Sequence, residues 1–101
     1  MGNSIYLLLS AFVFSAGVAL VLTRQNVIAV LIGVELVFNA ANINFVYFNA
    51  LYPERLDGQF FALVVITIAA AETALALAII VKLYRTYHTT NLDEISNLVE
   101  E

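Results

Sequence analysis

The chain has 101 residues, of which 62% are hydrophobic and only 12% are charged. Soluble globular domains average about 45–50% apolar and about 25% charged residues, so this composition is typical of an integral membrane protein. The absence of cysteine excludes disulfides, thiolate metal sites and cysteine nucleophiles. Four Lys and Arg against eight Asp and Glu give a net charge of −4, which argues against nucleic acid as a partner because no basic patch can neutralise phosphates.

Three apolar runs account for most of the chain, at about 5–22, 27–48 and 60–81. The first run has no charged residue, the second has only Glu35, and the third has only Glu72. Each run approaches the ~20 residues that a helix needs to cross ~30 Å of hydrocarbon. We therefore predict an all-α integral membrane protein, a single membrane domain over 1–101 with three transmembrane helices and a short cytoplasmic C-terminal tail.

The connecting segments carry the basic residues that indicate orientation. With three spans, the first connection and the C-terminus share one side, which holds Arg24, Lys82 and Arg85. The other side holds only Arg55, in the connection that also contains Pro53. The positive-inside rule then predicts that the N-terminus lies outside and the C-terminus lies in the cytoplasm.

The tail over 86–101 differs in composition from the spans. Asn91 followed three residues later by Glu94 resembles a capping box at a helix N-terminus. Apolar residues then recur at helical spacing, at Leu92, Ile95, Leu98 and Val99. Two interpretations stay open: a short amphipathic helix that lies on a partner or at the membrane interface, and a frayed acidic tail.

The two carboxyl groups inside the spans are the strongest functional signal. A charged side chain at the bilayer centre costs about 2.5–3.5 kcal/mol on insertion scales and often marks an ion or proton path. The helical rise places Glu35 roughly 16 Å beyond Arg24 and Glu72 roughly 15 Å before Lys82, so both lie near the midplane. This agreement favours a proton relay, whereas the alternative is that each glutamate only forms an interhelical hydrogen bond.

Amide side chains surround the first glutamate. Asn39 and Asn42 follow Glu35 at helical spacing on the same face and predict a small hydrated polar strip, although they could instead be packing contacts. Asn44 lies on roughly the opposite face of the same helix. Alanines around Glu72 and a stripe of small residues in the first span indicate packing against further helices, the stripe being Ala11, Ser15 and Ala19.

Two segments carry a family resemblance. One helix signature is found at residues 31–40, LIGVELVFNA. A second consists of Asp57-Gly58-Gln59 followed, at the family's spacing, by Ala69-Ala70-Ala71-Glu72. With them the sequence resembles, over nearly its whole length, the K (4L) subunit family of proton-pumping NADH:quinone oxidoreductase, respiratory complex I. The resemblance implies a place in the membrane arm, between the quinone-side subunits and the antiporter-like subunits. It also implies that Glu35 and Glu72 join a chain of buried charged groups that couples quinone reduction to proton transfer. In the relay expected from the residues, Asn39, Asn42 and Arg24 are the supporting polar groups.

The resemblance further implies a translocase whose redox chemistry belongs to other subunits. FMN, iron–sulfur clusters and quinone are expected there, while this chain binds no cofactor or metal and has no catalytic activity when isolated. The lone histidine, His88, lies in the tail and forms no metal or haem pair. Arg24 matches a basic position of the family, but the second arginine common in bacterial relatives is Gln25 here. The expected location is the bacterial plasma membrane, with an organelle inner membrane as the alternative.

Three other classes compete with this interpretation. The small subunit of a multisubunit sodium/proton antiporter is similar in fold, but the Ala-Ala-Ala-Glu signature ending at Glu72 favours complex I. A rotor subunit of an ATP synthase normally has two helices and one essential carboxylate. A non-catalytic packing subunit would keep both glutamates as hydrogen-bonding groups only. The electron donor stays open, because NADH or ferredoxin would be selected by peripheral subunits.

Overall fold

The computed structural model describes residues 2–100 of the chain and the side chains of residues 4–100. Four helices follow one another, which are α1 Gly2–Thr23, α2 Val27–Leu51, α3 Asp57–Tyr87 and α4 Leu92–Glu100. The first three are long and apolar enough to cross a membrane. The described part of the chain therefore confirms the prediction of an all-α membrane fold with three spans.

The helix ends lie beyond the ends of the apolar runs. The second run ends near 48, but α2 continues to Leu51; the third run covers 60–81, but α3 extends from Asp57 to Tyr87. The reason is that hydropathy marks where side chains leave the hydrocarbon, whereas backbone hydrogen bonds continue through polar residues into the interface. As a result, α3 ends at Tyr87, only two residues into the predicted tail over 86–101.

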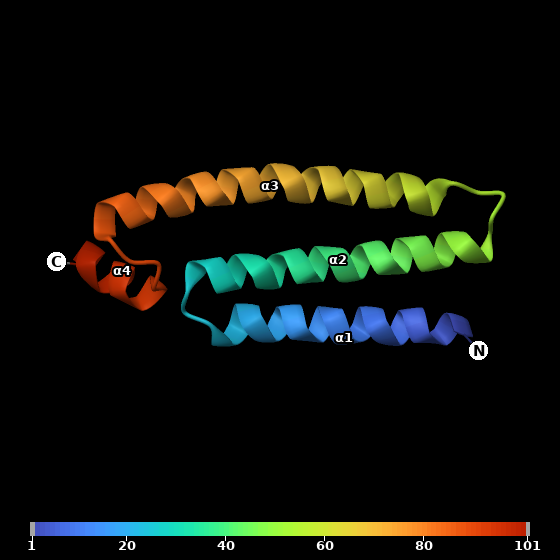
Figure 1. Ribbon diagram of the computed structural model, residues 1–101, viewed down its shortest axis with the longest axis horizontal. Coiled ribbons are helices and arrows are strands. Elements are labelled where there is room, and N and C mark those ends of the chain that lie inside the picture. The colour runs from blue at the N-terminus through green and yellow to red at the C-terminus, as the bar shows by residue number, and fades with distance from the viewer. Residues whose placement is uncertain (1, 101) are drawn as a thin grey trace.

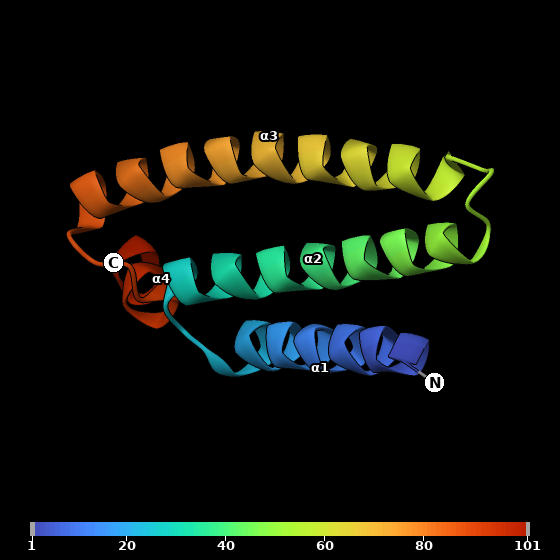
Figure 2. The same cartoon turned by 45° about the vertical axis from the view of Figure 1, so that its right-hand side comes forward.

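The three long helices form a flat layer. Figures 1 and 2 show α2 between α1 and α3, with the three axes running side by side. The chain measures 58 × 24 × 15 Å along its principal axes, and a single helix with side chains is about 10–12 Å across. The layer is thus one helix thick, and the buried apolar side chains within residues 4–100 are few, namely Ala40, Ala62, Ile80 and Ile95.

Glycines bring α1 and α2 close together. A Cβ atom at Gly17 would lie 2.6 Å from the carbonyl oxygen of Gly33, and one at Gly33 would lie 2.7 Å from that of Gly17. Next to this crossing, the buried Ser10 hydroxyl donates a hydrogen bond to the carbonyl oxygen of Ala40 at 2.9 Å. The predicted small-residue stripe of α1, which is Ala11, Ser15 and Ala19, is exposed in this chain. Two of its members, Ala11 and Ser15, border an opening between α1 and α2.

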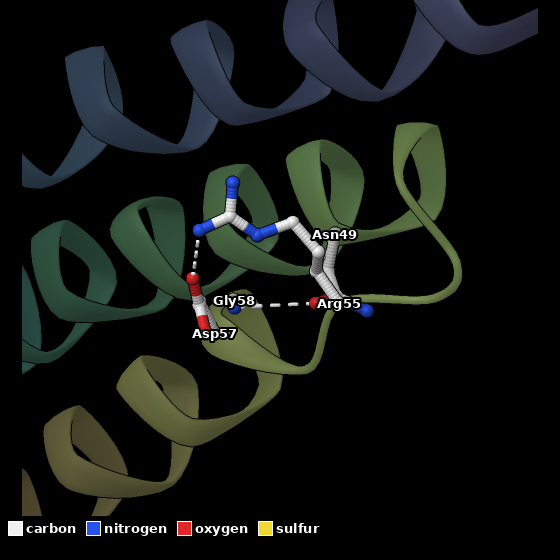
Figure 3. A network of polar contacts seen from close by, with 4 residues as sticks. All are labelled: Asn49, Arg55, Asp57 and Gly58. Carbon is white, nitrogen blue, oxygen red and sulfur yellow. Dashed lines mark hydrogen bonds and ion pairs between the residues drawn. The ribbon is translucent and has the colours of Figure 1, made fainter.

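The turn between α2 and α3 relies on one glycine and one asparagine (Figure 3). A Cβ atom at Gly58 would lie 2.6 Å from the Cβ of Asn49 and would also meet the carbonyl oxygen of Phe45. The buried Asn49 side chain accepts a hydrogen bond from the Gly58 N–H at 3.2 Å, which satisfies one of the free N–H groups at the start of α3. The tight turn therefore explains why a glycine follows Asp57. The Arg55–Asp57 ion pair beside the turn is exposed.

At the opposite end, the α1–α2 loop pairs with the segment before α4. The Val27 N–H donates to the Thr90 carbonyl at 2.9 Å, and the Leu92 N–H donates to the Gln25 carbonyl at 2.8 Å. The side chain of Asn26 adds a hydrogen bond to the Thr90 hydroxyl at 3.0 Å. We call this pairing of residues 25–27 with residues 90–92 the loop clasp. It holds α4 against the end of the layer that carries the α1–α2 loop.

The segment after α3 turns sharply into α4. His88 has a φ of 57° in the left-handed region and caps α3, with its N–H bonded to the Tyr84 carbonyl. The Asn91 side chain accepts from the Glu94 N–H at 3.0 Å and thus caps α4, as the sequence pattern predicted. The Glu94 carboxylate, however, accepts from the Thr89 hydroxyl at 2.6 Å instead of returning to the Asn91 backbone, so only half of the capping box forms.

Candidate functional site

Glu35 lies in the middle of α2, half-buried, on the side that faces α3. The Thr73 hydroxyl of α3 donates a hydrogen bond to the Glu35 carboxylate. Thr73 directly follows Glu72 in the chain, and sequence reasoning did not single it out. Its position beside a carboxyl group within a span could have indicated a role for Thr73. Threonine hydroxyls in helices, however, commonly bond to the backbone of their own helix, so the sequence did not predict a contact with α2.

Glu35 and Glu72 line the same open cavity between α2 and α3, with a volume of about 310 Å³. The remaining lining is apolar and comes from both helices, namely Val27, Val30, Leu31, Val34, Ala76, Ile79 and Ile80. Glu72 is exposed at the face of the layer, whereas Glu35 is partly covered. The structure therefore brings together the two glutamates that helical rise alone placed at a similar depth. We call this opening the glutamate cavity.

A second open cavity holds the amides. Glu35, Asn39 and Asn42 line it together with Phe38, Ile66, Ala69 and Ala70, and its volume is about 290 Å³. Asn39 and Asn42 also border a larger opening of about 650 Å³ that reaches Tyr6 of α1 and Tyr47 of α2. We call the second opening the amide cavity. The polar strip predicted for one face of α2 is thus present, and Glu35 belongs to both the glutamate and the amide cavity.

The other sequence-predicted residues lie apart from this centre. Asn44 borders a separate opening between α1 and α2, which also contains Ser10 and Ala40. Arg24 is exposed in the α1–α2 loop and lines none of the cavities described above. His88 is exposed at the end of α3. The structure therefore groups Glu35, Glu72, Asn39 and Asn42, and it does not bring Arg24 to them.

The chemistry available at the centre is that of carboxyl, hydroxyl and amide groups. Carboxyl groups can bind and release a proton, while the threonine hydroxyl and the asparagine amides donate and accept hydrogen bonds. The Oδ1 atoms of Asn42 and Asn44 are buried without a hydrogen-bond partner among the described residues. No group of three or more His, Asp or Glu within the described residues could hold a metal ion. The arrangement suits proton transfer and hydration.

These features define a class: a small multi-pass membrane protein with a carboxyl pair between two of its spans. Comparison with known proteins gives the family. The family model of NADH-ubiquinone/plastoquinone oxidoreductase chain 4L matches residues 5–100, and the chain belongs to this family.

Curated relatives agree along nearly their whole length. The chain is 42% identical to NADH-quinone oxidoreductase subunit K of Chlorobaculum parvum over 100 residues, covering 99% of this chain and 94% of the relative. It is 45% identical to that of Roseiflexus castenholzii over 96 residues, covering 95% of each chain. It is 48% identical to that of Acidithiobacillus ferrooxidans over 94 residues, covering 92% and 89%. The resemblance seen in the sequence is confirmed, and the antiporter alternative is not favoured.

Proposed function

We propose that the chain works as subunit K in the membrane part of an NADH-quinone oxidoreductase, where Glu35 and Glu72 pass protons in step with quinone reduction. The observation that carries this proposal is the shared glutamate cavity, since the two spans each contribute one carboxyl group to it. Ionisable side chains within membrane spans are costly and often mark an ion or proton path.

The polar groups of α2 give protons a route to and from the pair. Asn39 and Asn42 line the amide cavity next to Glu35, and amide groups can hold water by donating and accepting hydrogen bonds. Because Glu35 borders both cavities, it is the group through which a proton would pass between the water held by the amides and Glu72. This gives Glu35 the central role and Glu72 the role of its exchange partner.

The proposal includes the surroundings of the chain. Exposed apolar side chains cover both faces of the layer, which suits contact with lipid and with other membrane-arm subunits, the quinone-side and antiporter-like ones. FMN, iron–sulfur clusters and quinone would be bound by other subunits. The basic residues favour a cytoplasmic loop clasp and C-terminus in a bacterial plasma membrane, where Arg24 would contribute to orientation and not to the relay.

Relocating the Glu35 carboxyl group tests the proposal. The double variant Glu35→Ala with Asn39→Glu moves the group one turn along α2 to another side chain of the amide cavity. We expect it to restore part of the pumping that Glu35→Ala removes, because a relay that runs through water tolerates a shift of roughly 6 Å. Proton uptake by membrane vesicles during quinone reduction is the measurement.

The matched control is Glu35→Ala with Val37→Glu. Val37 lines the opening between α1 and α2 that contains Asn44, so a carboxyl group there faces away from α3 and should restore nothing. Equal restoration from positions 39 and 37 would contradict a relay on the α3 side of α2. Full pumping by Glu35→Ala alone would leave the glutamates a packing role.

A further inference from the structure

The hydroxyl groups of the three long helices bond in two different ways. Most donate to the carbonyl oxygen four residues earlier in their own helix, namely Ser15, Thr23, Thr67 and Thr86. Among the described residues of these helices, two hydroxyls cross to a neighbouring helix. Ser10 donates to a backbone carbonyl of α2, and Thr73 donates to the Glu35 carboxylate. Thr73 is therefore the one whose partner is an ionisable group.

The Thr73–Glu35 contact lies where the two cavities adjoin, since Glu35 lines both. The α3 residues of the amide cavity are Ile66, Ala69 and Ala70, and those of the glutamate cavity are Glu72, Ala76, Ile79 and Ile80. Thr73 comes three residues after Ala70 of the amide cavity and directly after Glu72 of the glutamate cavity, and Glu35 borders both cavities from α2. The hydrogen bond thus joins α2 to α3 at the level where one cavity gives way to the other.

Protonation of Glu35 changes the strength of its hydrogen bond with Thr73. An ionised carboxylate only accepts hydrogen bonds, so it holds the threonine hydroxyl as a donor. A protonated carboxyl group gains a donor of its own and becomes a weaker acceptor, so it holds the Thr73 hydroxyl less strongly. The hydroxyl can then turn to the carbonyl oxygen of Ala69, four residues earlier, since threonine has two accessible side-chain rotamers in a helix.

We propose that Thr73 is a positioning residue that holds the ionised Glu35 side chain against α3, where the amide and glutamate cavities adjoin, and releases it when the carboxyl group takes up a proton. This inference rests on the proposed function of Glu35 as a proton carrier. Glu72 is the titratable group of α3 that shares a cavity with Glu35. From α1, the titratable side chain within residues 4–23 is Tyr6, which borders a different opening.

The test compares three variants in the assembled complex. Thr73→Val keeps the shape of the side chain and removes the hydroxyl, Thr73→Ser keeps the hydroxyl, and Thr67→Val removes a hydroxyl of α3 that bonds only to its own helix. We expect Thr73→Val to lower pumping per assembled complex about tenfold, the equivalent of losing one hydrogen bond to a charged group. Thr73→Ser should keep most of the pumping, and Thr67→Val should leave it unchanged.

An infrared readout separates positioning from packing. The band of the ionised carboxylate that disappears in Glu35→Gln should shift in Thr73→Val and stay in place in Thr73→Ser and Thr67→Val. If Thr73→Val assembles poorly, Thr73→Ala supplies the same comparison per assembled complex. An unshifted band, or equal losses in Thr73→Val and Thr73→Ser, would overturn the inference. If Glu35→Gln pumps normally, the proposed function fails; if it does not pump while Thr73→Val does, only the role of Thr73 fails.

Discussion

The two interfaces of α2 are built on different principles. Towards α1, the backbones meet at Gly17 and Gly33, and the side-chain link is a serine hydroxyl on a backbone carbonyl. Towards α3, close backbone contact occurs at the Gly58 end, while the middle holds open cavities with two carboxyl groups. The α1 side also has openings, which are bordered by hydroxyl and amide groups, but the cavity that holds both carboxyl groups lies on the α3 side. We therefore call the side of α2 that meets α1 its structural face and the side that meets α3 its chemical face.

The largest effect should come from the chemical face. Glu35→Gln keeps the shape and hydrogen-bonding capacity of the side chain but cannot exchange a proton, so the assembled complex should lose most of its quinone reduction and pumping. Glu72→Gln should assemble and pump less well, with a smaller loss than Glu35→Gln because its side chain is more exposed than that of Glu35. Quinone reductase activity and vesicle acidification measure both. Normal activity in both variants would make the α3 interface as purely structural as the α1 interface.

A change on the structural face should affect assembly instead of turnover. Gly33→Ala places a methyl group against the Gly17 carbonyl oxygen and the Val21 side chain, and overpacking of this kind costs about 1–3 kcal/mol. We expect less assembled complex and a lower denaturation temperature, with near-normal pumping per complex. The amount of complex in native gels and its rate per complex are the measurements. A large loss of pumping at full assembly would show that the α1 interface also takes part in the chemistry.

The smallest effects should separate buried from exposed polar contacts at the α2–α3 turn. Asn49→Ala removes the acceptor for the Gly58 N–H and should cost about 1 kcal/mol. Arg55→Ala removes an ion pair whose side chains are 68% and 63% exposed, and such pairs contribute about 0–1 kcal/mol. Thermal denaturation of the complex compares the two. A larger loss from Arg55→Ala would mean that this arginine binds a partner in the assembly.

The three spans and the similar depth of the two glutamates could be predicted from the sequence, because they depend on hydropathy and helical rise alone. The face through which each helix packs depends on its rotation about its own axis, and helices that are apolar all round carry no strong signal for it. For this reason the stripe at Ala11, Ser15 and Ala19, two members of which border an opening beside α2, did not indicate Ser10 and Gly17, the residues that contact α2 closely. The same uncertainty hid Thr73, since its contact with Glu35 depends on the rotation of α3.

The loop clasp has a consequence for the order in which the chain matures. Its hydrogen bonds join segments far apart in sequence, as in the Asn26–Thr90 pair, which is separated by 64 positions. Closing so long a loop is entropically unfavourable until the intervening helices are in place. The clasp can therefore form only after α2 and α3 have both entered the membrane and turned back. Its formation marks the completion of the α2–α3 hairpin.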